Sequence, residues 1–187
     1  MAFEGAREIP ILELGISQIY LSVDKVRAVE AWLDPAAVRG MEPLPVYDFG
    51  NGRYTLTDGH TRAYVAFQRG IACLPVVYDT DDLVTGEMGG LLYRTDIEWC
   101  ERFHLKDVSD LQDRIVAREA YERLWIGRCE RSFRLLSRTT PEEREALRQK
   151  APSLYLYGAS EDASTLFFED AQGARFVYRA GRLLRER

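Results

Sequence analysis

The sequence is poor in the features that hold small secreted proteins and membrane proteins together. Its three cysteines, Cys73, Cys100 and Cys129, are an odd number and form no Cys-x-x-Cys pair. This pattern is more typical of reduced thiols in the cytosol than of a disulfide bridge or a zinc site. No apolar run reaches transmembrane length, and the first residues carry no signal-peptide pattern. We therefore expect a cytoplasmic protein that does not associate with a membrane.

Positive charge is also in short supply. The 187 residues include 30 acidic and 25 basic side chains, for a formal net charge of −5. A negative field repels phosphodiester backbones, so a nucleic-acid partner is disfavoured. The chain has two histidines, and His104 has no partner at metal-ligand spacing, which argues against a zinc site. A chain of this length can bury a sizeable hydrophobic core without disulfides. The sequence is also compatible with a homodimer.

Residues 1–80 alternate between strand and helix patterns. Asp34-Pro35 ends the first helix pattern, Gly50-Asn51-Gly52 is typical of a hairpin turn, and Gly70 is typical of a helix end. The elements expected from these signals are strands at Ile9–Leu14, Gln18–Leu21, Leu44–Phe49, Arg53–Thr57 and Cys73–Tyr78, and helices from Ser22 to about Leu33 and from His60 to Gln68.

Residues 81–187 change to a helical pattern and return to strands at the end. Three capping boxes, beginning at Thr95, Ser109 and Thr140, predict three helix starts. Residues 116–136 are amphipathic, and their arginines are interpreted as a solvated face. Strands are expected at Leu154–Tyr157, Leu166–Glu169 and Arg175–Arg179. Their many aromatic side chains suit a hairpin packed on helices better than an aromatic binding platform.

The most informative stretch is Asp58-Gly59-His60-Thr61-Arg62, which joins a strand to a helix. The first amides of a helix have no intrahelical acceptor, and the helix dipole adds partial positive charge, so a phosphate binds there readily. Arg62 would add a cationic fork, and His60 and Asp58 would lie beside the phosphate. The alternative without function is that Asp58 caps the helix, Gly59 relieves the turn, His60 faces solvent and Arg62 pairs with a surface acid.

This stretch, with Gln18-Ile19-Tyr20-Leu21-Ser22 and Pro43-Leu44-Pro45-Val46 before it, resembles the ParB/sulfiredoxin superfamily, which includes the ParB-like nuclease and N-terminal domains. Members hold nucleotide phosphates with a Gly-x-x-Arg turn, which Gly59 and Arg62 match. The resemblance implies an α+β fold: a small mixed-sheet nucleotide-binding domain over residues 1–80, then a helical region with a C-terminal β-hairpin over residues 81–187, packed on the first part.

Within the superfamily, the turn is most similar to that of the free-serine kinases, which read Asp-Gly-x-His-Arg. Asp58, Gly59 and Arg62 match, while Thr61 replaces the histidine and His60 stands one position earlier. Sulfiredoxins have a catalytic cysteine where this chain has His60, and the helix-turn-helix of ParB proteins is missing. The resemblance therefore implies a kinase rather than either of those activities.

The kinase resemblance implies roles for individual residues. Asp58, His60 and Asp24 are the catalytic candidates, and Glu30 is a second candidate for the base that these kinases carry in the first helix. ATP or ADP would contact a second set, comprising Ser22, Gly59, His60, Thr61 and Arg62. Asp58 would also contact Mg²⁺.

Two alternatives remain open. One is a nucleotide-binding or protein-interaction module without catalysis. The other is a DNA-binding ParB-like protein or nuclease, which the acidic charge disfavours. Ser22 is explained as a helix cap without any contact to a nucleotide, and Lys25 either reaches a phosphate or is solvated.

Overall fold

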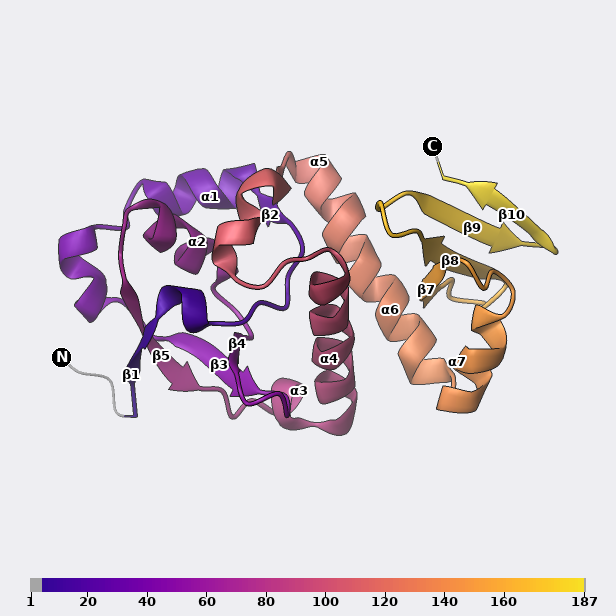
Figure 1. Cartoon of the computed structure of the whole chain (residues 1–187), viewed down its shortest axis with the longest axis horizontal. Helices are drawn as coiled ribbons and strands as arrows, with labels where there is room; N and C mark the ends of the chain where they lie inside the picture. Colours follow the sequence, from indigo (N-terminus) through magenta and orange to yellow (C-terminus); the bar gives the residue numbers. More distant parts are fainter. Residues whose placement is uncertain (1–4, 187) are drawn as a thin grey trace. The chain divides into compact units, whose positions relative to one another are not determined.

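The computed structural model describes residues 5–186 and has the mixed α+β architecture that the sequence predicts. Contacts divide the chain into two compact units, the first ending at Tyr121 and the second beginning at Glu122. The sequence instead predicted this boundary after residue 80, where its pattern becomes helical. Residues 81–121 belong to the first unit by their contacts. In Figure 1 this unit runs from indigo to salmon and the second from salmon to yellow.

A four-stranded mixed sheet forms the base of the first unit, with strand order β1-β5-β3-β4. β3 and β5 are parallel, and the other two pairs are antiparallel. The hairpin predicted around Gly50 and Gly52 is present, and both glycines have positive φ. The strands are β1 (Arg7–Pro10), β3 (Leu44–Asp48), β4 (Tyr54–Leu56) and β5 (Cys73–Tyr78).

Arg53, just before β4, ties the hairpin to two neighbouring segments. Its guanidinium donates hydrogen bonds to the carbonyls of Leu12, Glu13 and Leu14, at 2.8 to 3.0 Å, and to that of Lys106 at 2.9 Å. The first segment is a short 3₁₀ helix, η1 (Ile11–Glu13), in place of the extended chain predicted to Leu14.

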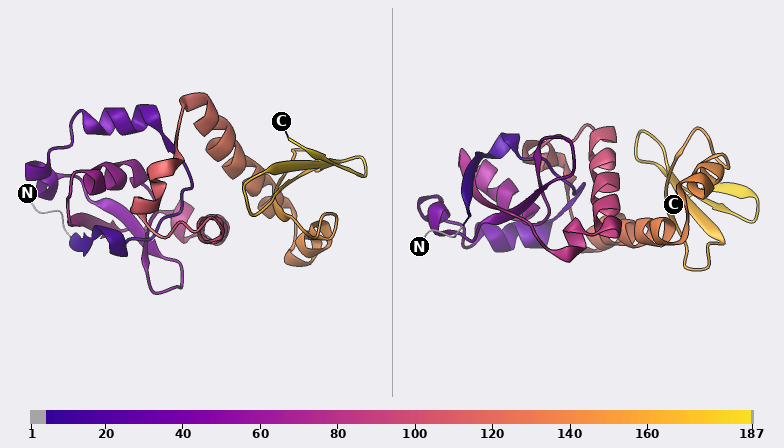
Figure 2. Two further views of the ribbon diagram at one scale, coloured as in Figure 1. Left: turned by 45° about the horizontal axis from the view of Figure 1, so that its top comes forward. Right: turned by 90° about the horizontal axis from the view of Figure 1, so that it is seen from below.

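Two helices, α1 (Val23–Glu30) and α2 (His60–Gln68), pack together, and Figures 1 and 2 show α2 lying between α1 and the sheet. α2 has the bounds that the sequence predicts, and Gly70 follows its end with φ +72°. α1 ends at Glu30, before the predicted end at about Leu33, and Asp34 then caps a separate 3₁₀ helix, η2 (Pro35–Gly40).

The segment after Ser17 contributes only a two-residue strand, β2 (Leu21–Ser22), instead of a strand from Gln18. It pairs in parallel with β6 (Ile115–Val116), which the sequence did not predict. This pairing brings the chain entering α1 against a segment far along the sequence.

The helix start predicted at Thr95 is wrong. Thr95 lies inside α4 (Glu87–Arg102), which follows the short α3 (Asp82–Thr85). Its hydroxyl donates to the carbonyl of Leu91 at 2.9 Å, a bond within the helix that competes with capping.

The other two helix starts are close to their predicted places. The helix predicted to start at Ser109 is η3 (Val108–Arg114), a 3₁₀ helix that is capped by Asp107 rather than by Ser109. The third, α7 (Pro141–Arg148), begins at the predicted box, with Thr140 as its N-cap. The first unit closes with α5 (Arg118–Tyr121).

The second unit combines helices with a sheet whose strands follow chain order. The helical part is η4 (Glu122–Ile126), with π-type geometry, then α6 (Gly127–Arg138) and α7. The antiparallel strands are β7 (Tyr155–Ala159), β8 (Thr165–Glu169), β9 (Arg175–Arg179) and β10 (Arg182–Arg185). The predicted C-terminal hairpin is therefore confirmed, and β10 extends it. Leu135, Leu156, Leu166 and Phe168 form the core.

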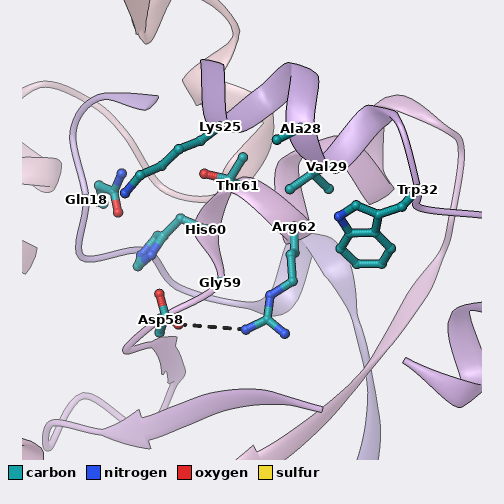
Figure 3. Close-up of a pocket in the computed structure, with 10 residues that line it drawn as sticks. All are labelled: Gln18, Lys25, Ala28, Val29, Trp32, Asp58, Gly59, His60, Thr61 and Arg62. Carbon is teal, nitrogen blue, oxygen red and sulfur yellow. Dashed lines mark ion pairs between the residues drawn. The ribbon is translucent and has the colours of Figure 1, made fainter. Parts of the chain in front are cut away.

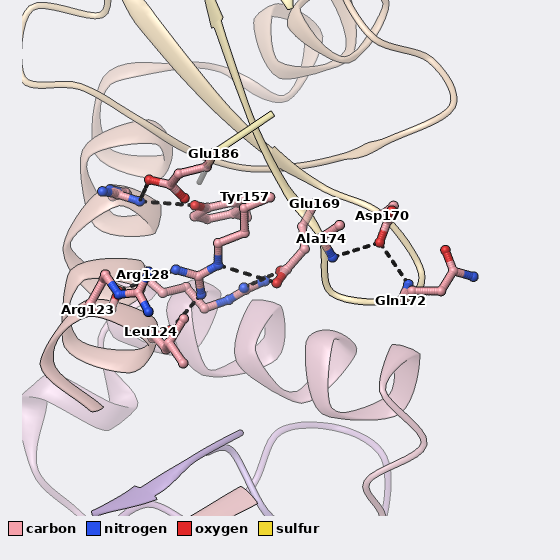
Figure 4. Close-up of polar contacts among 11 residues, drawn as sticks. Arg123, Leu124, Arg128, Tyr157, Glu169, Asp170, Gln172, Ala174 and Glu186 are labelled. Carbon is pink, nitrogen blue, oxygen red and sulfur yellow. Dashed lines mark hydrogen bonds and ion pairs between the residues drawn. The ribbon is translucent and has the colours of Figure 1, made fainter. Parts of the chain in front are cut away.

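A buried ion network lies within this unit. It overturns the interpretation of the arginines in residues 116–136 as solvated for Arg128 alone, because Arg118 and Arg123 are exposed as that interpretation predicts. Arg128 is fully buried and forms an ion pair with Glu169 (Figure 4). Arg175 contacts the same carboxylate at 3.5 Å and donates to the carbonyl of Leu124 at 2.9 Å. The Arg128 guanidinium also lies 4.6 Å from the ring centre of Tyr157. The Glu169 carboxylate offsets part of the cost of burying the two guanidinium groups, because a buried charge without an opposite partner is far more costly.

None of the helices in residues 5–186 combines the length and the apolar character that a membrane span requires.

Candidate functional site

A cavity of about 310 Å³ opens in the first unit between α1 and the start of α2 (Figure 3). This volume lies at the lower end of the range of small-molecule sites. Most of the predicted turn faces it. The lining residues are Gln18, Lys25, Ala28, Val29, Trp32, Asp58, Gly59, His60, Thr61 and Arg62.

Gly59 shapes the helix start at the cavity. It is the N-cap of α2 and adopts the left-handed conformation, with φ +80°. A Cβ at this position would lie 2.7 Å from Leu44 Cδ2 and 3.2 Å from the Arg62 Nη2 atom. No side chain caps the helix. The first amides of α2 are therefore left without intrahelical acceptors at the positive end of the dipole.

Arg62 is held at the cavity without being locked in place. Its guanidinium lies 3.7 Å from an Asp58 oxygen and 3.8 Å from a Glu42 oxygen. Both distances exceed that of a charge-assisted hydrogen bond, and both carboxylates are exposed to water. An incoming anion can therefore exchange these contacts for stronger ones. Arg62 does lie near two surface acids, as the alternative without function predicts, but it also lines the cavity.

His60 is buried, which excludes the alternative that it faces solvent. Its Nε2 atom accepts a hydrogen bond from the Ser17 amide at 3.0 Å. Burial lowers the pKa of His60 to about 4, against a smaller opposing effect of the Asp58 charge. At pH 7 the ring is therefore neutral, with its proton on Nδ1. Because this hydrogen bond occupies the Nε2 lone pair, His60 cannot act as a base. Of the roles predicted for His60, it keeps only that of a hydrogen-bond donor through Nδ1–H.

The polar side chains at the other edges of the cavity come from three segments. Asp58 is exposed just before α2, and Thr61 is half-buried in the first turn of that helix. Lys25 lies on α1, with its Nζ atom 3.5 Å from the Tyr121 hydroxyl and 5.0 Å from the centre of that ring. Gln18 donates to the Tyr20 carbonyl at 2.6 Å.

Three residues considered for the site from the sequence, Ser22, Asp24 and Glu30, do not line the cavity. Ser22 is buried as the N-cap of α1, although its side chain makes no capping hydrogen bond. Asp24 lies exposed in the first turn of α1, and Glu30 is exposed at the end of that helix. The structure therefore brings together Asp58, Gly59, His60, Thr61 and Arg62, but neither Ser22 nor Asp24.

A protein-only metal site is absent from residues 5–186, where no group of three His, Cys, Asp or Glu side chains is placed to hold a metal ion. Asp58 is the carboxylate that lines the cavity. Mg²⁺ bound to a nucleotide commonly uses one or two carboxylates together with phosphate oxygens, and Asp58 fits that need.

Sequence reasoning missed one wall of the cavity. Ala28, Val29 and Trp32 line it from α1 and the residues just beyond, on the same side as Lys25. Their spacing of three, four and seven residues after Lys25 was the available signal, because residues at these intervals share one helix face.

Comparisons with known proteins do not identify a family for this sequence. No family model matches the sequence, and no curated protein matches it. Among solved structures, the crystal structure of protein Atu1540 from Agrobacterium tumefaciens is similar, with a TM-score of 0.36 and 16% identity over 60% of this chain. The match spans 61% of that protein.

Proposed function

We propose that the cavity binds the phosphate groups of a nucleotide, and that the protein is a phosphotransferase of the ParB/sulfiredoxin superfamily. It moves a phosphoryl group from ATP or ADP to a small hydroxylated acceptor such as serine. One observation carries the proposal: the uncapped start of α2 and the Arg62 guanidinium line the same cavity of about 310 Å³.

The electrostatics of the cavity support an anionic ligand. Lys25 and Arg62 are cationic, His60 is neutral and Asp58 is the one acidic side chain of the lining. A phosphate at the α2 amides would receive a bidentate contact from Arg62 that is shorter and stronger than its present ion pairs.

The chemistry follows from the same residues. Asp58 takes the proton of the acceptor hydroxyl, whose oxygen attacks the terminal phosphorus as the bond to the departing nucleotide oxygen breaks. Arg62 and the α2 amides stabilise the charge on the transferring group. In an alternative role, Asp58 would hold a Mg²⁺ ion together with the phosphates instead of serving as the base, and the ion would supply further neutralisation of that charge.

The test is nucleotide consumption with ATP or ADP, Mg²⁺ and a panel of hydroxyl compounds that begins with serine. Arg62→Ala should lower the rate roughly 100-fold or more, as loss of a transition-state donor does. Arg69→Ala is the matched control, because Arg69 lies at the other end of α2 and contacts the Glu30 carbonyl. Consumption no faster than that of Arg62→Ala would contradict phosphoryl transfer.

A second candidate is a nucleotide-binding module without turnover. It is favoured by the hydrogen bond between Ser17 and His60 Nε2, which removes one candidate base, and by the exclusion of Asp24 from the cavity lining. Calorimetric binding of ADP together with no consumption of nucleotide for any acceptor would select this candidate.

A further inference from the structure

Trp32 stands apart from the other two tryptophans. It exposes 54% of its surface, whereas Trp99 and Trp125 expose 2% and 7%. A large apolar ring exposed to water is unfavourable unless something covers it. Trp32 also lines the cavity proposed to bind phosphate, so its exposed ring faces a space of ligand size.

The cavity has two chemically different ends. Trp32 shares its end with the apolar side chains of Ala28 and Val29, while the α2 turn supplies charge and free amides at the other. Figure 3 shows the Arg62 side chain between His60 and Trp32. A ligand that fills both ends is anionic at one end and flat and apolar at the other.

We infer that Trp32 is the stacking platform for the base of a nucleotide whose phosphates occupy the start of α2. This inference rests on the proposed function and deepens it, because inorganic phosphate or a sugar phosphate would use the polar end alone. Aromatic side chains stack on the face of any base, and a purine offers the larger face. Trp32 thus makes the ligand a nucleoside phosphate, with a purine preferred.

The experiment measures Kd by calorimetry for ADP, pyrophosphate and ribose 5-phosphate with the whole chain. Trp32→Ala should weaken ADP binding roughly 5- to 150-fold, the range for removal of one base–aromatic stack, and leave the other two ligands unchanged. Trp32→Phe should recover part of the loss. Phe133→Ala removes an exposed aromatic residue from α6, outside the cavity, and should change nothing. Thermal unfolding verifies that each variant folds.

The outcomes separate the two proposals. If pyrophosphate binds but ADP binds no more tightly, or if Trp32→Ala leaves ADP affinity unchanged, the stacking inference is wrong and the phosphate site stands. If Trp32→Ala weakens pyrophosphate and ADP equally, Trp32 shapes the cavity and the inference again fails. If the wild-type protein binds none of the three ligands, both the phosphate site and the stacking platform are overturned.

Discussion

Replacement of His60 by Gln should reduce the acid sensitivity of the fold. The pKa of His60 is about 4 in the folded protein against 6.5 for an ordinary histidine. Between these values the unfolded chain binds more protons, so acid favours unfolding: stability is full above pH 6.5 and falls as the pH drops toward 4. From these two pKa values, protonation of His60 costs about 2 kcal/mol at pH 5 relative to pH 7.

Urea unfolding at pH 7 and pH 5 measures this cost. His60→Gln keeps an acceptor for the Ser17 amide but cannot titrate. Both proteins retain His104 and every carboxylate, so the difference between their pH dependences isolates His60. The wild type should lose about 2 kcal/mol more than the variant between the two pH values. Losses that agree within about 0.5 kcal/mol, the usual limit of additivity, would refute the assignment of His60 as buried, neutral and hydrogen-bonded.

Three further substitutions test local features of the structure by chemical denaturation. Gly59→Ala should destabilise the fold more than Gly70→Ala. Both glycines have positive φ, a conformation that costs an alanine about 1 kcal/mol or more. Of the two positions, only Gly59 has neighbouring atoms that an added Cβ would contact. Equal costs would contradict the close approach. Glu169→Gln should cost roughly 3 to 5 kcal/mol, because it leaves two buried arginines without a carboxylate. A cost under about 1 kcal/mol, typical of an exposed pair, would show that the network is solvated. Arg53→Met should cost roughly 2 to 3 kcal/mol through its four lost carbonyl contacts, and an unchanged midpoint would refute their role.

Elements fixed by local signals could be predicted from the sequence. The bounds of α2 follow from Gly59 and Gly70, which supply positive φ at both ends, and from an apolar face between them. The hairpin at Gly50 and Gly52 is equally local. At Thr95 a local signal failed, because the helix had begun eight residues earlier and the hydroxyl bonded within it.

Features that depend on distant residues could not be predicted. His60 is buried, and the amide that donates to its ring belongs to Ser17, 43 positions away. Arg128 occurs in an amphipathic pattern typical of a solvated face, but Glu169, 41 positions away, pairs with it in the core. The turn of the candidate site was visible in the sequence, whereas the place of Trp32 depended on how α1 packs against α2.

The account depends most on the claim that the start of α2 accepts a phosphate group. Titration of ¹⁵N-labelled protein with pyrophosphate at pH 7, followed by amide resonances, tests it directly. The account predicts that the amides of His60, Thr61 and Arg62 shift most, and that Arg62→Ala weakens the titration while Arg69→Ala does not. Shifts confined to residues 122–186, or no saturable shift at the start of α2, would contradict it.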